Sequence, residues 1–414
     1  MSQKPRKLLL HLTVPLLPVD SGGKRKLLGT LQYFRERKDF FSVDVVSRND
    51  FGSTIWTVEQ REEILKTANN LFICDGEHNF LDFVYSRSKS FYHQKLLKQQ
   101  MPVDTDYFTP PGYIKFVRSL LSEHKYDLIW INTPDYAHLG LKGTRSSGHP
   151  VHTILDIVDL QCQMRLARET IGYLKGLKFD YEANFKKEIK LLNQFEKLII
   201  TSQEEMALIK PYIPSDKLHL IPYPLEDLNP TATLVPYSDR EFKYDLLFVG
   251  AAYHPNVEGM NFFLTSIFPK IVEYKPDIRF AVAGRVCDFI QVDPAFKQNI
   301  DCLGFVDDLS ELYSTSKVVI CPLLHGSGTK IKLQEAMNYG IPIVTTRCGA
   351  SGLSLNDGVN AFITDEPELY AQRALNLVKE PKLAQKVSEE LAMKFEREYS
   401  RSAVYSKLDA MLGI

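Results

Sequence analysis

The residues best suited to chemistry lie in one stretch, 321–346, where an apolar run is followed by a glycine-rich loop and a helical pattern. Its notable residues are Gly326, Ser327, Gly328, Thr329, Lys330 and Glu335. Glycines let the backbone approach a ligand, and the N–H groups at a helix start favour negative charge. Lys330 adds a cation, and Glu335 can accept hydrogen bonds from vicinal hydroxyls such as those of a ribose. The stretch predicts a diphosphate site, although a plain strand–loop–helix unit has the same pattern.

Three other loops of the second half follow strand-like segments. Gly250 ends one segment and His254 follows four residues later, in a turn that permits close backbone approach. Arg285 stands at the end of a second segment, where a guanidinium can bind phosphate bidentately. Phe305 and Val306 could form an apolar wall for a base. Each also has an ordinary interpretation: a tight turn, a surface arginine and a turn before a helix.

The first half contributes two weaker candidates. Gly22 and Gly23 precede a basic helical segment and would let the backbone approach an anionic group, unless they only form a flexible loop. Asp159 ends the strand-like segment 151–158, where a carboxylate can meet a sugar hydroxyl or accept a proton. A helix N-cap or a structural ion pair would use the same residue.

The elements that position these residues alternate between strand-like and helix-like segments, the pattern of a parallel α/β sheet. The alternation stops in a proline-rich stretch and then restarts, so the sequence predicts two domains, 1–225 and 244–394, joined by a linker at 226–243. We expect two Rossmann-like parallel sheets facing a central cleft, with ligands at the carboxyl ends of the strands.

Composition narrows the class of protein. The 414 residues include 50 basic and 51 acidic side chains, and a formal charge of −1 argues against general nucleic-acid binding. No apolar run approaches the roughly 20 residues of a membrane span. The six cysteines form no CxxC pair, and no other motif predicts a metal site. The composition is typical of a soluble, cytoplasmic enzyme of two domains.

Residues 244–364 resemble the catalytic domain of the GT-B glycosyltransferases of the large retaining family four, also called glycosyl transferases group 1. The matching pieces are FVGAAYHPNVEGM, VAGR, LGFVDDLSELYSTSKVVICPL, GSGTKIKLQEAMNYGIPIVTT and CGASGL. The first half is similar to the family more loosely, through LDIVDL, IITSQEE, LHLIPYPLE and the glycine turn at 22–23.

This resemblance implies a nucleotide-sugar donor bound by the second domain and an acceptor bound by the first. Glu335 would bind the donor ribose, Phe305 and Val306 the base, and Thr329, Lys330 and Arg285 the diphosphate. It implies neither a metal ion nor another cofactor, because protein cations neutralise the leaving diphosphate. A last helix within 395–414 would cross back onto the first domain.

Three positions depart from the family pattern. Ser327 stands where many relatives have a second glutamate, Val158 where they often have a histidine, and 221–226 replaces the usual hinge sequence. We expect a transferase that moves a sugar from a nucleoside diphosphate to a glycan, lipid-linked or small acceptor, with Lys330, Glu335 and Asp159 as its catalytic group. The resemblance alone implies that the anomeric configuration is retained and that no metal is needed. The alternatives are an inverting transferase, a sugar-nucleotide epimerase, a non-catalytic nucleotide-sugar-binding or scaffold protein, and a membrane-surface adaptor that uses the basic helix 24–38.

Overall fold

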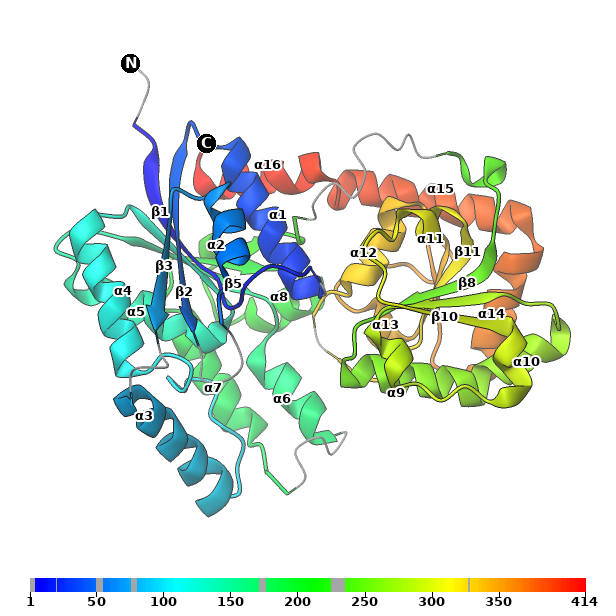
Figure 1. The fold of residues 1–414 in the computed structure, drawn as a ribbon, viewed down its shortest axis with the longest axis horizontal. Helices are drawn as coiled ribbons and strands as arrows, with labels where there is room; N and C mark the ends of the chain where they lie inside the picture. The colour runs from blue at the N-terminus through cyan, green and yellow to red at the C-terminus, as the bar shows by residue number, and fades with distance from the viewer. Residues whose placement is uncertain are drawn as a thin grey trace. The chain divides into compact units, whose positions relative to one another are not determined.

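The computed structural model describes residues 4–19, 21–49, 55–75, 80–170, 176–224, 235–326 and 328–414. The chain divides into two compact units (Figure 1). Unit 1 comprises Met1–Glu226 together with Lys407–Ile414, and unit 2 comprises Asp227–Ser406. The first half of the predicted linker, 226–243, lies outside the described residues, as does Ser327 of the glycine-rich loop.

Unit 1 contains a seven-stranded parallel sheet among its described residues. In spatial order the strands are β3 (Asn70–Asp75), β2 (Phe41–Asn49), β1 (Arg6–His11), β4 (Leu128–Asn132), β5 (His152–Ile157), β6 (Lys197–Ile200) and β7 (Leu218–Leu220). The order runs outward from β1 in both directions, so the sheet has a switch point between β1 and β4. Ligands of such sheets bind outside the carboxyl ends of the strands at that point.

Helices cover both faces of this sheet. They are α1 (Gly22–Glu36), α2 (Val58–Leu65), α3 (Phe80–Ser90), the π-helical η2 (Phe91–Leu96), α4 (Pro111–His124), α5 (Ala137–Gly143), α6 (Gln161–Thr170), α7 (Tyr181–Leu192) and α8 (Gln203–Ile209). Successive residues of a strand point to opposite faces. Ile129 and Ile131 of β4 pack into one core with α4 and α5, whereas Trp130 contacts Phe34 of α1 edge-on, with ring centroids 5.5 Å apart.

Unit 2 contains a six-stranded parallel sheet among its described residues. In spatial order its strands are β10 (Ile300–Gly304), β9 (Phe280–Ala283), β8 (Tyr244–Val249), β11 (Ser316–Cys321), β12 (Ile343–Thr345) and β13 (Phe362–Ile363). The switch point lies between β8 and β11. The two sheets confirm the predicted α/β fold of two Rossmann-like halves.

The central strands β9 and β11 of unit 2 are largely apolar and buried because helices cover both faces. The helices are α9 (His254–Phe262), the π-helical η7 (Phe263–Ile267), α10 (Phe268–Tyr274), α11 (Ser310–Ser314), α12 (Ile331–Asn338), α13 (Arg347–Ala350), α14 (Pro367–Lys379) and α15 (Pro381–Glu398). Val318 and Ile320 of β11 belong to one core, with α9, α10 and α14. Val319 and Cys321 belong to the other, with α12 and α15.

The end of the chain completes unit 1. Helix α16 (Arg401–Leu412) contributes the buried residues Leu408, Met411 and Leu412. The Asp409 carboxylate accepts two hydrogen bonds from the Arg37 guanidinium, at 2.8 and 3.0 Å, and a third from the Tyr33 hydroxyl at 2.8 Å. No helix in the described part of the chain is long and apolar enough to cross a membrane.

Candidate functional site

The predicted donor-site residues of unit 2 lie in loops that leave the carboxyl ends of neighbouring strands. The backbones of three such loops are in direct contact. Gly284 donates from its N–H to the carbonyl of Gly304 (2.6 Å), and Val286 donates to the carbonyl of Gly250 (3.2 Å). A Cβ on Gly284 would lie 2.2 Å from the Gly250 oxygen, at a φ of +101°. Only glycine can therefore join these loops so closely.

The glycine-rich loop lies beside them at the switch point. Gly326 and Gly328 have φ values of +144° and +65°, which favour glycine. The loop leads into α12, whose N-cap is Lys330. The Lys330 side chain is 8% exposed, and its Nζ donates to the carbonyl of Gly328 (2.6 Å). An ammonium group and a helix N-terminus therefore lie at one place, an arrangement suited to an anion.

Glu335 is fixed in orientation. Its side chain is 3% exposed, and its Oε2 accepts a hydrogen bond of 2.9 Å from the Tyr313 hydroxyl. The Tyr313 ring is stacked on Tyr339, with ring centroids 5.1 Å apart. Sequence reasoning identified Glu335 and missed Tyr313, which lies in the matching stretch but carries no distinguishing local signal.

Lys332 joins α12 to the first turn of α9. Its Nζ donates to Oδ1 of Asn256 (2.6 Å) and lies 4.2 Å from the centre of the Phe248 ring. Desolvation lowers the pKa of Lys332 to about 8. Lys332 stands two residues after Lys330 but is not among the site residues predicted from the sequence.

The remaining predicted residues of unit 2 are more exposed. Arg285 begins the turn after β9 and is exposed, and Phe305 is 49% exposed after β10. Val306 packs instead against the apolar core. His254 is the first residue of α9 and lies against Glu258 (3.4 Å). Thr329 donates from its hydroxyl to the carbonyl of Gly352 (3.4 Å).

Three predicted residues belong to unit 1. Gly22 and Gly23 form the first turn of α1, and Asp159 follows β5. Gly23 and Asp159 line the same cavity of about 540 Å³ at the switch point of this sheet. Other residues that line it include Lys24, Asn132, Asp135, Met164, Arg165 and Arg168. Their side chains supply hydrogen-bond donors and acceptors beside apolar surface.

Two buried carboxylates hold the loop that carries Asp159. Glu188 accepts hydrogen bonds from the backbone N–H groups of Gln161 (2.7 Å) and Cys162 (2.9 Å), at the start of α6. Glu205 accepts one from the N–H of Leu160 (3.1 Å). The loop is therefore held from two sides, and Asp159 is presented to the cavity.

Arginines of α6 give the cavity a positive side. Arg165 is 7% exposed, donates to the carbonyl of Met101, and lies 3.6 Å from Asp135. Burial raises the pKa of Asp135, and the charges of Arg165 and Arg168 oppose that rise. The two arginines are three residues apart, six and nine residues after Asp159, and this helical spacing is the sequence signal that could have identified them.

The basic segment 24–38 is only partly a solvated face. Lys26, on α1, is 3% exposed, and its Nζ lies 2.6 Å from Oδ1 of Asp156. Arg37 is paired with Asp409. These two side chains are therefore not available to a membrane surface as the basic helix 24–38 would require, because α1 packs them against the sheet and against α16.

Comparison with known proteins finds a family match within unit 2. A family model described as glycosyl transferases group 1 matches residues 243–380. An uncharacterised 44.6 kDa protein from the cps region of Klebsiella pneumoniae is 27% identical over 155 residues. That alignment covers 33% of this chain and 40% of the Klebsiella protein.

Solved structures match both units together. HepE of Anabaena, in complex with UDP and glucose, matches with a TM-score of 0.65 and 15% identity over 99% of each chain. TarM of S. aureus, in complex with fondaparinux, α-GlcNAc-glycerol and UDP, matches with a TM-score of 0.67 and 11% identity. This alignment covers 99% of this chain and 100% of TarM. At these identities the likeness establishes the fold, which is GT-B.

Proposed function

We propose that this chain, whose residues 243–380 match the family model of glycosyl transferases group 1, transfers a sugar from a nucleoside-diphosphate sugar to a hydroxyl group. Unit 2 binds the donor and unit 1 binds the acceptor. The acceptor is a glycan, a lipid-linked sugar or a small molecule. The anomeric configuration is retained, and no metal ion takes part in the transfer. The observation that carries the proposal is the junction of the glycine-rich loop with α12, where Lys330 and a helix N-terminus meet.

The geometry of this junction suits a diphosphate. Backbone N–H groups at the start of α12 are directed toward the loop, and the Lys330 ammonium lies within hydrogen-bond reach of the same backbone. As the glycosidic bond breaks, negative charge grows on the departing diphosphate. A positive charge and oriented dipoles that are already in place stabilise this charge more in the transition state than in the ground state.

Glu335, which lies five residues after Lys330 on α12, supports nucleotide binding. A carboxylate can accept hydrogen bonds from both hydroxyls of a ribose, and the Tyr313 hydroxyl fixes one of its oxygens. Phe305 offers an exposed aromatic face for a base. Arg285, at the end of β9, is the second candidate cation for the phosphates.

The cavity of unit 1 suits an acceptor that carries several hydroxyl groups. Asp135 and Asp159 supply acceptors for such hydroxyls, and Lys24 and Arg165 supply donors. Asp159 is our candidate for contact with the transferred sugar or the attacking hydroxyl. The volume of about 540 Å³ lies within the usual range for a small-molecule site.

The similar proteins support a role in polysaccharide synthesis. The Klebsiella relative is named for its place in a cps region, and HepE was crystallised with UDP-glucose as well as with UDP and glucose. We therefore include UDP-glucose among the candidate donors and a growing polysaccharide among the candidate acceptors.

A donor panel tests the proposal. Purified protein is incubated with UDP-, GDP-, ADP- and dTDP-sugars, and release of the nucleoside diphosphate is measured without an acceptor and with a panel of glycans. We expect slow hydrolysis of donors of one base, faster release with one acceptor class, and loss of both in Lys330→Ala and Glu335→Ala. Lys382→Ala is the matched control, because Lys382 is an exposed lysine in the first turn of α15. Equal turnover in wild type and Lys330→Ala would refute the proposed site.

A further inference from the structure

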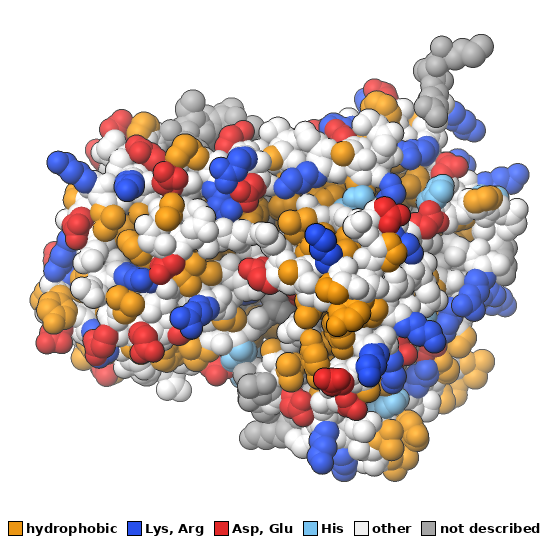
Figure 2. All heavy atoms as spheres, turned by 180° about the vertical axis from the view of Figure 1, so that it is seen from behind, with side chains coloured by type: hydrophobic (Ala, Val, Ile, Leu, Met, Phe, Trp, Pro, Cys, Tyr) orange, Lys and Arg blue, Asp and Glu red, His pale blue; other side chains and the backbone are white. Residues whose placement is uncertain are grey.

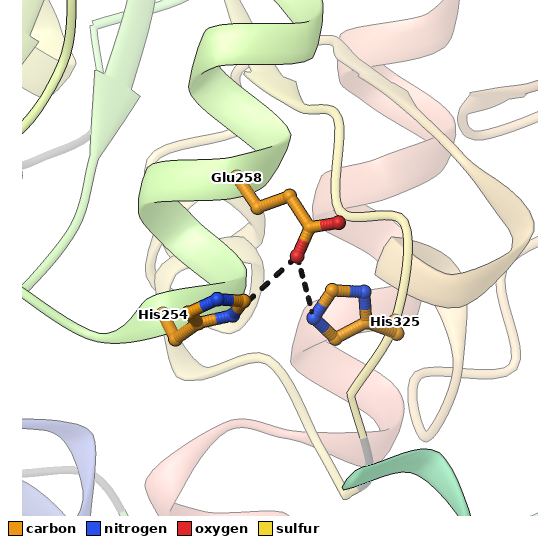
Figure 3. A group of neighbouring side chains, drawn as sticks. All are labelled: His254, Glu258 and His325. Atoms are coloured by element: carbon orange, nitrogen blue, oxygen red, sulfur yellow. Dashed lines mark ion pairs between the residues drawn. The ribbon is translucent and has the colours of Figure 1, made fainter. Parts of the chain in front are cut away.

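Three side chains of unit 2 converge at the switch point between β8 and β11. Figure 3 shows His254 and Glu258 on α9 and His325 in the loop before Gly326, with their polar atoms directed at one another. Oε2 of Glu258 lies 3.4 Å from Nδ1 of His254 and 3.1 Å from Nε2 of His325. The three potential ligand atoms lie within 4.8 Å of one another.

These distances suit one metal ion bound by all three side chains. With bonds of about 2.0–2.1 Å, the ligand atoms of a tetrahedral zinc site are about 3.3 Å apart. Two of the three separations here already have that length. Oε2 of Glu258 and Nε2 of His325 are buried and, apart from the ion-pair contacts within this cluster, make no hydrogen bond with any described residue. Two imidazoles and one carboxylate form a ligand set that zinc uses, with the fourth position open.

The backbone holds this cluster together. Helix α9 lies directly on the segment that leaves β11, because a Cβ on Gly259 would lie only 2.7 Å from the carbonyl oxygen of Pro322. Glu258 precedes this contact on the helix, and His325 follows it by three residues in the loop. Asn256 on α9 also receives the Lys332 hydrogen bond. Helix α9 is therefore held against the segment that leads to His325 and is also bonded to α12.

We propose that His254, Glu258 and His325 bind one divalent transition-metal ion of the zinc class. The ion would tie α9 to the residue before the glycine-rich loop and so stabilise the loop conformation. It would lie outside the group of residues to which we assign the transfer.

Metal binding itself provides the test. The purified chain is stripped with a chelator and titrated with zinc chloride by equilibrium dialysis, and Co²⁺ absorption spectra then report whether thiolates take part. We expect one tight site per chain with nitrogen and oxygen ligands. Glu258→Gln and His325→Gln should each weaken it by at least the roughly 10- to 100-fold that loss of an outer-sphere partner costs.

His152→Gln is the matched control, because His152 forms a surface pair with Glu196 (2.5 Å) in unit 1 and belongs to no such cluster. Its zinc affinity should equal that of the wild type. Circular dichroism of the metal-free variants establishes that they are folded. Absence of a tight site in the wild type, thiolate spectra, or unchanged affinity in both cluster variants would overturn the proposal. The assay contains no donor, so its result does not depend on the proposed transferase activity.

A second, independent observation concerns the outer side of α3 and η2 in unit 1. One side of α3 is fastened by polar contacts. Asp82 accepts a hydrogen bond from the N–H of Gly112 (2.8 Å), the Tyr85 hydroxyl donates to Asp106 (3.0 Å), and Lys89 pairs with Asp106. Helices normally pack their apolar side inward, and this one packs a polar side inward.

The opposite side is apolar and exposed. We call it the α3–η2 surface, and its residues are Phe80 (70% exposed), Leu81 (77%), Val84 (44%), Phe91 (58%), Tyr92 (52%), Leu96 (62%) and Leu97 (43%). Exposed basic side chains accompany it at Arg87, Lys95 and Lys98. The only acidic residue of 80–98 is the buried Asp82. Figure 2 shows hydrophobic and basic side chains together at the lower right, where α3 lies.

We infer that the α3–η2 surface binds an anionic lipid bilayer. Apolar side chains that enter the acyl boundary, flanked by cations that meet anionic headgroups, are the composition of an interfacial helix. The charge complementarity favours this occupant over a second copy of the chain, which would bring the same positive charges together. Gln94 of η2 also lines the unit 1 cavity. If the proposed function holds, a lipid-linked acceptor at the bilayer would therefore lie near that cavity.

Co-sedimentation of the full chain with vesicles tests this inference. We expect binding to vesicles of phosphatidylcholine with phosphatidylglycerol, and much weaker binding to phosphatidylcholine alone. Phe91→Ser should weaken binding about tenfold or more, because burial of one phenylalanine is worth at least that factor. Phe289→Ser is the matched control, since Phe289 is 56% exposed in unit 2.

Two outcomes would overturn the inference. One is that the wild-type chain does not bind anionic vesicles, whether or not it binds a second copy of itself. The other is equal loss of binding in Phe91→Ser and Phe289→Ser. The assay needs no nucleotide sugar, so a failure here leaves the proposed transferase activity to its own test.

Discussion

At the scale of single residues, the candidate donor site depends on side chains that are held in place by neighbours. Glu335 is oriented by Tyr313, and Tyr313 is in turn stacked on Tyr339. Lys330 lies at a helix start and is hydrogen-bonded to the loop before it. Pre-set positions of this kind reduce the entropy that is lost when a ligand binds.

Removal of the Tyr313 hydroxyl tests whether this orientation serves donor binding. Tyr313→Phe should raise the KM for the donor about five- to tenfold, the usual worth of one hydrogen bond, with little change in kcat. The control Tyr274→Phe alters a tyrosine that is 68% exposed in the same unit and should leave KM unchanged. A fall in kcat alone would contradict a donor-binding role for Glu335.

His11 gives the fold a pH dependence. It is 1% exposed in β1, its ring lies tilted against that of Tyr136 with centroids 4.5 Å apart, and burial lowers its pKa from 6.5 to about 3. The folded chain therefore keeps His11 neutral while the unfolded chain takes up a proton below pH 6.5, so acid favours unfolding. Between pH 7 and 5 the wild-type free energy of unfolding should fall about 2 kcal/mol more than that of His11→Leu. Urea titrations at both pH values measure this, and parallel losses in the two proteins would refute it.

At the scale of elements, the loops between strands and helices place the site. Much of this was predictable from the sequence, because the apolar strands of unit 2 are continuous runs and the glycine-rich loop follows one of them. The edge strand β7 was not predictable, since three residues between prolines carry no periodic signal. Helix α3 was missed because its apolar side faces outward and its polar side packs inward.

The contact between the loops after β8 and β9 yields an element-scale prediction. Gly284→Ala places a Cβ 2.2 Å from the Gly250 oxygen at positive φ, whereas Gly304→Ala has the same kind of φ with no atom within 4 Å. Positive φ alone costs about 1–2 kcal/mol for alanine. Gly284→Ala should therefore lose clearly more unfolding free energy than Gly304→Ala in urea titrations. Equal losses of unfolding free energy in the two variants would show that the loops after β8 and β9 can move apart without destabilising the fold.

At the scale of the whole molecule, the end of the chain belongs to the fold of unit 1. Residues Leu408, Met411 and Leu412 are 2–3% exposed, and Arg6 donates to the carbonyl of Leu412 (2.7 Å). No pattern within 395–414 indicates which sheet the last helix packs on. Only the family resemblance predicted that this helix would pack on the first domain.

Deletion of 407–414 tests the role of the chain end. The loss of several buried apolar side chains, each worth about 2–5 kcal/mol, should lower the calorimetric transition of unit 1 strongly. Chymotryptic cleavage before and after partial heating identifies which unit has unfolded. Deletion of only Gly413 and Ile414, which are exposed, is the control and should leave the transition in place. First unfolding of unit 2 in the deletion variant would contradict the division into units.

The central claim is that unit 2 binds a nucleoside diphosphate at the start of α12. Calorimetric titration with UDP, GDP, ADP and dTDP, on wild type, Lys330→Ala and Lys382→Ala, tests it most directly. The account predicts that one nucleotide binds wild type and Lys382→Ala equally and binds Lys330→Ala about 10- to 100-fold more weakly, the worth of a hydrogen bond to a charged group. Failure of all four nucleotides to bind, or equal affinity for Lys330→Ala, would contradict it.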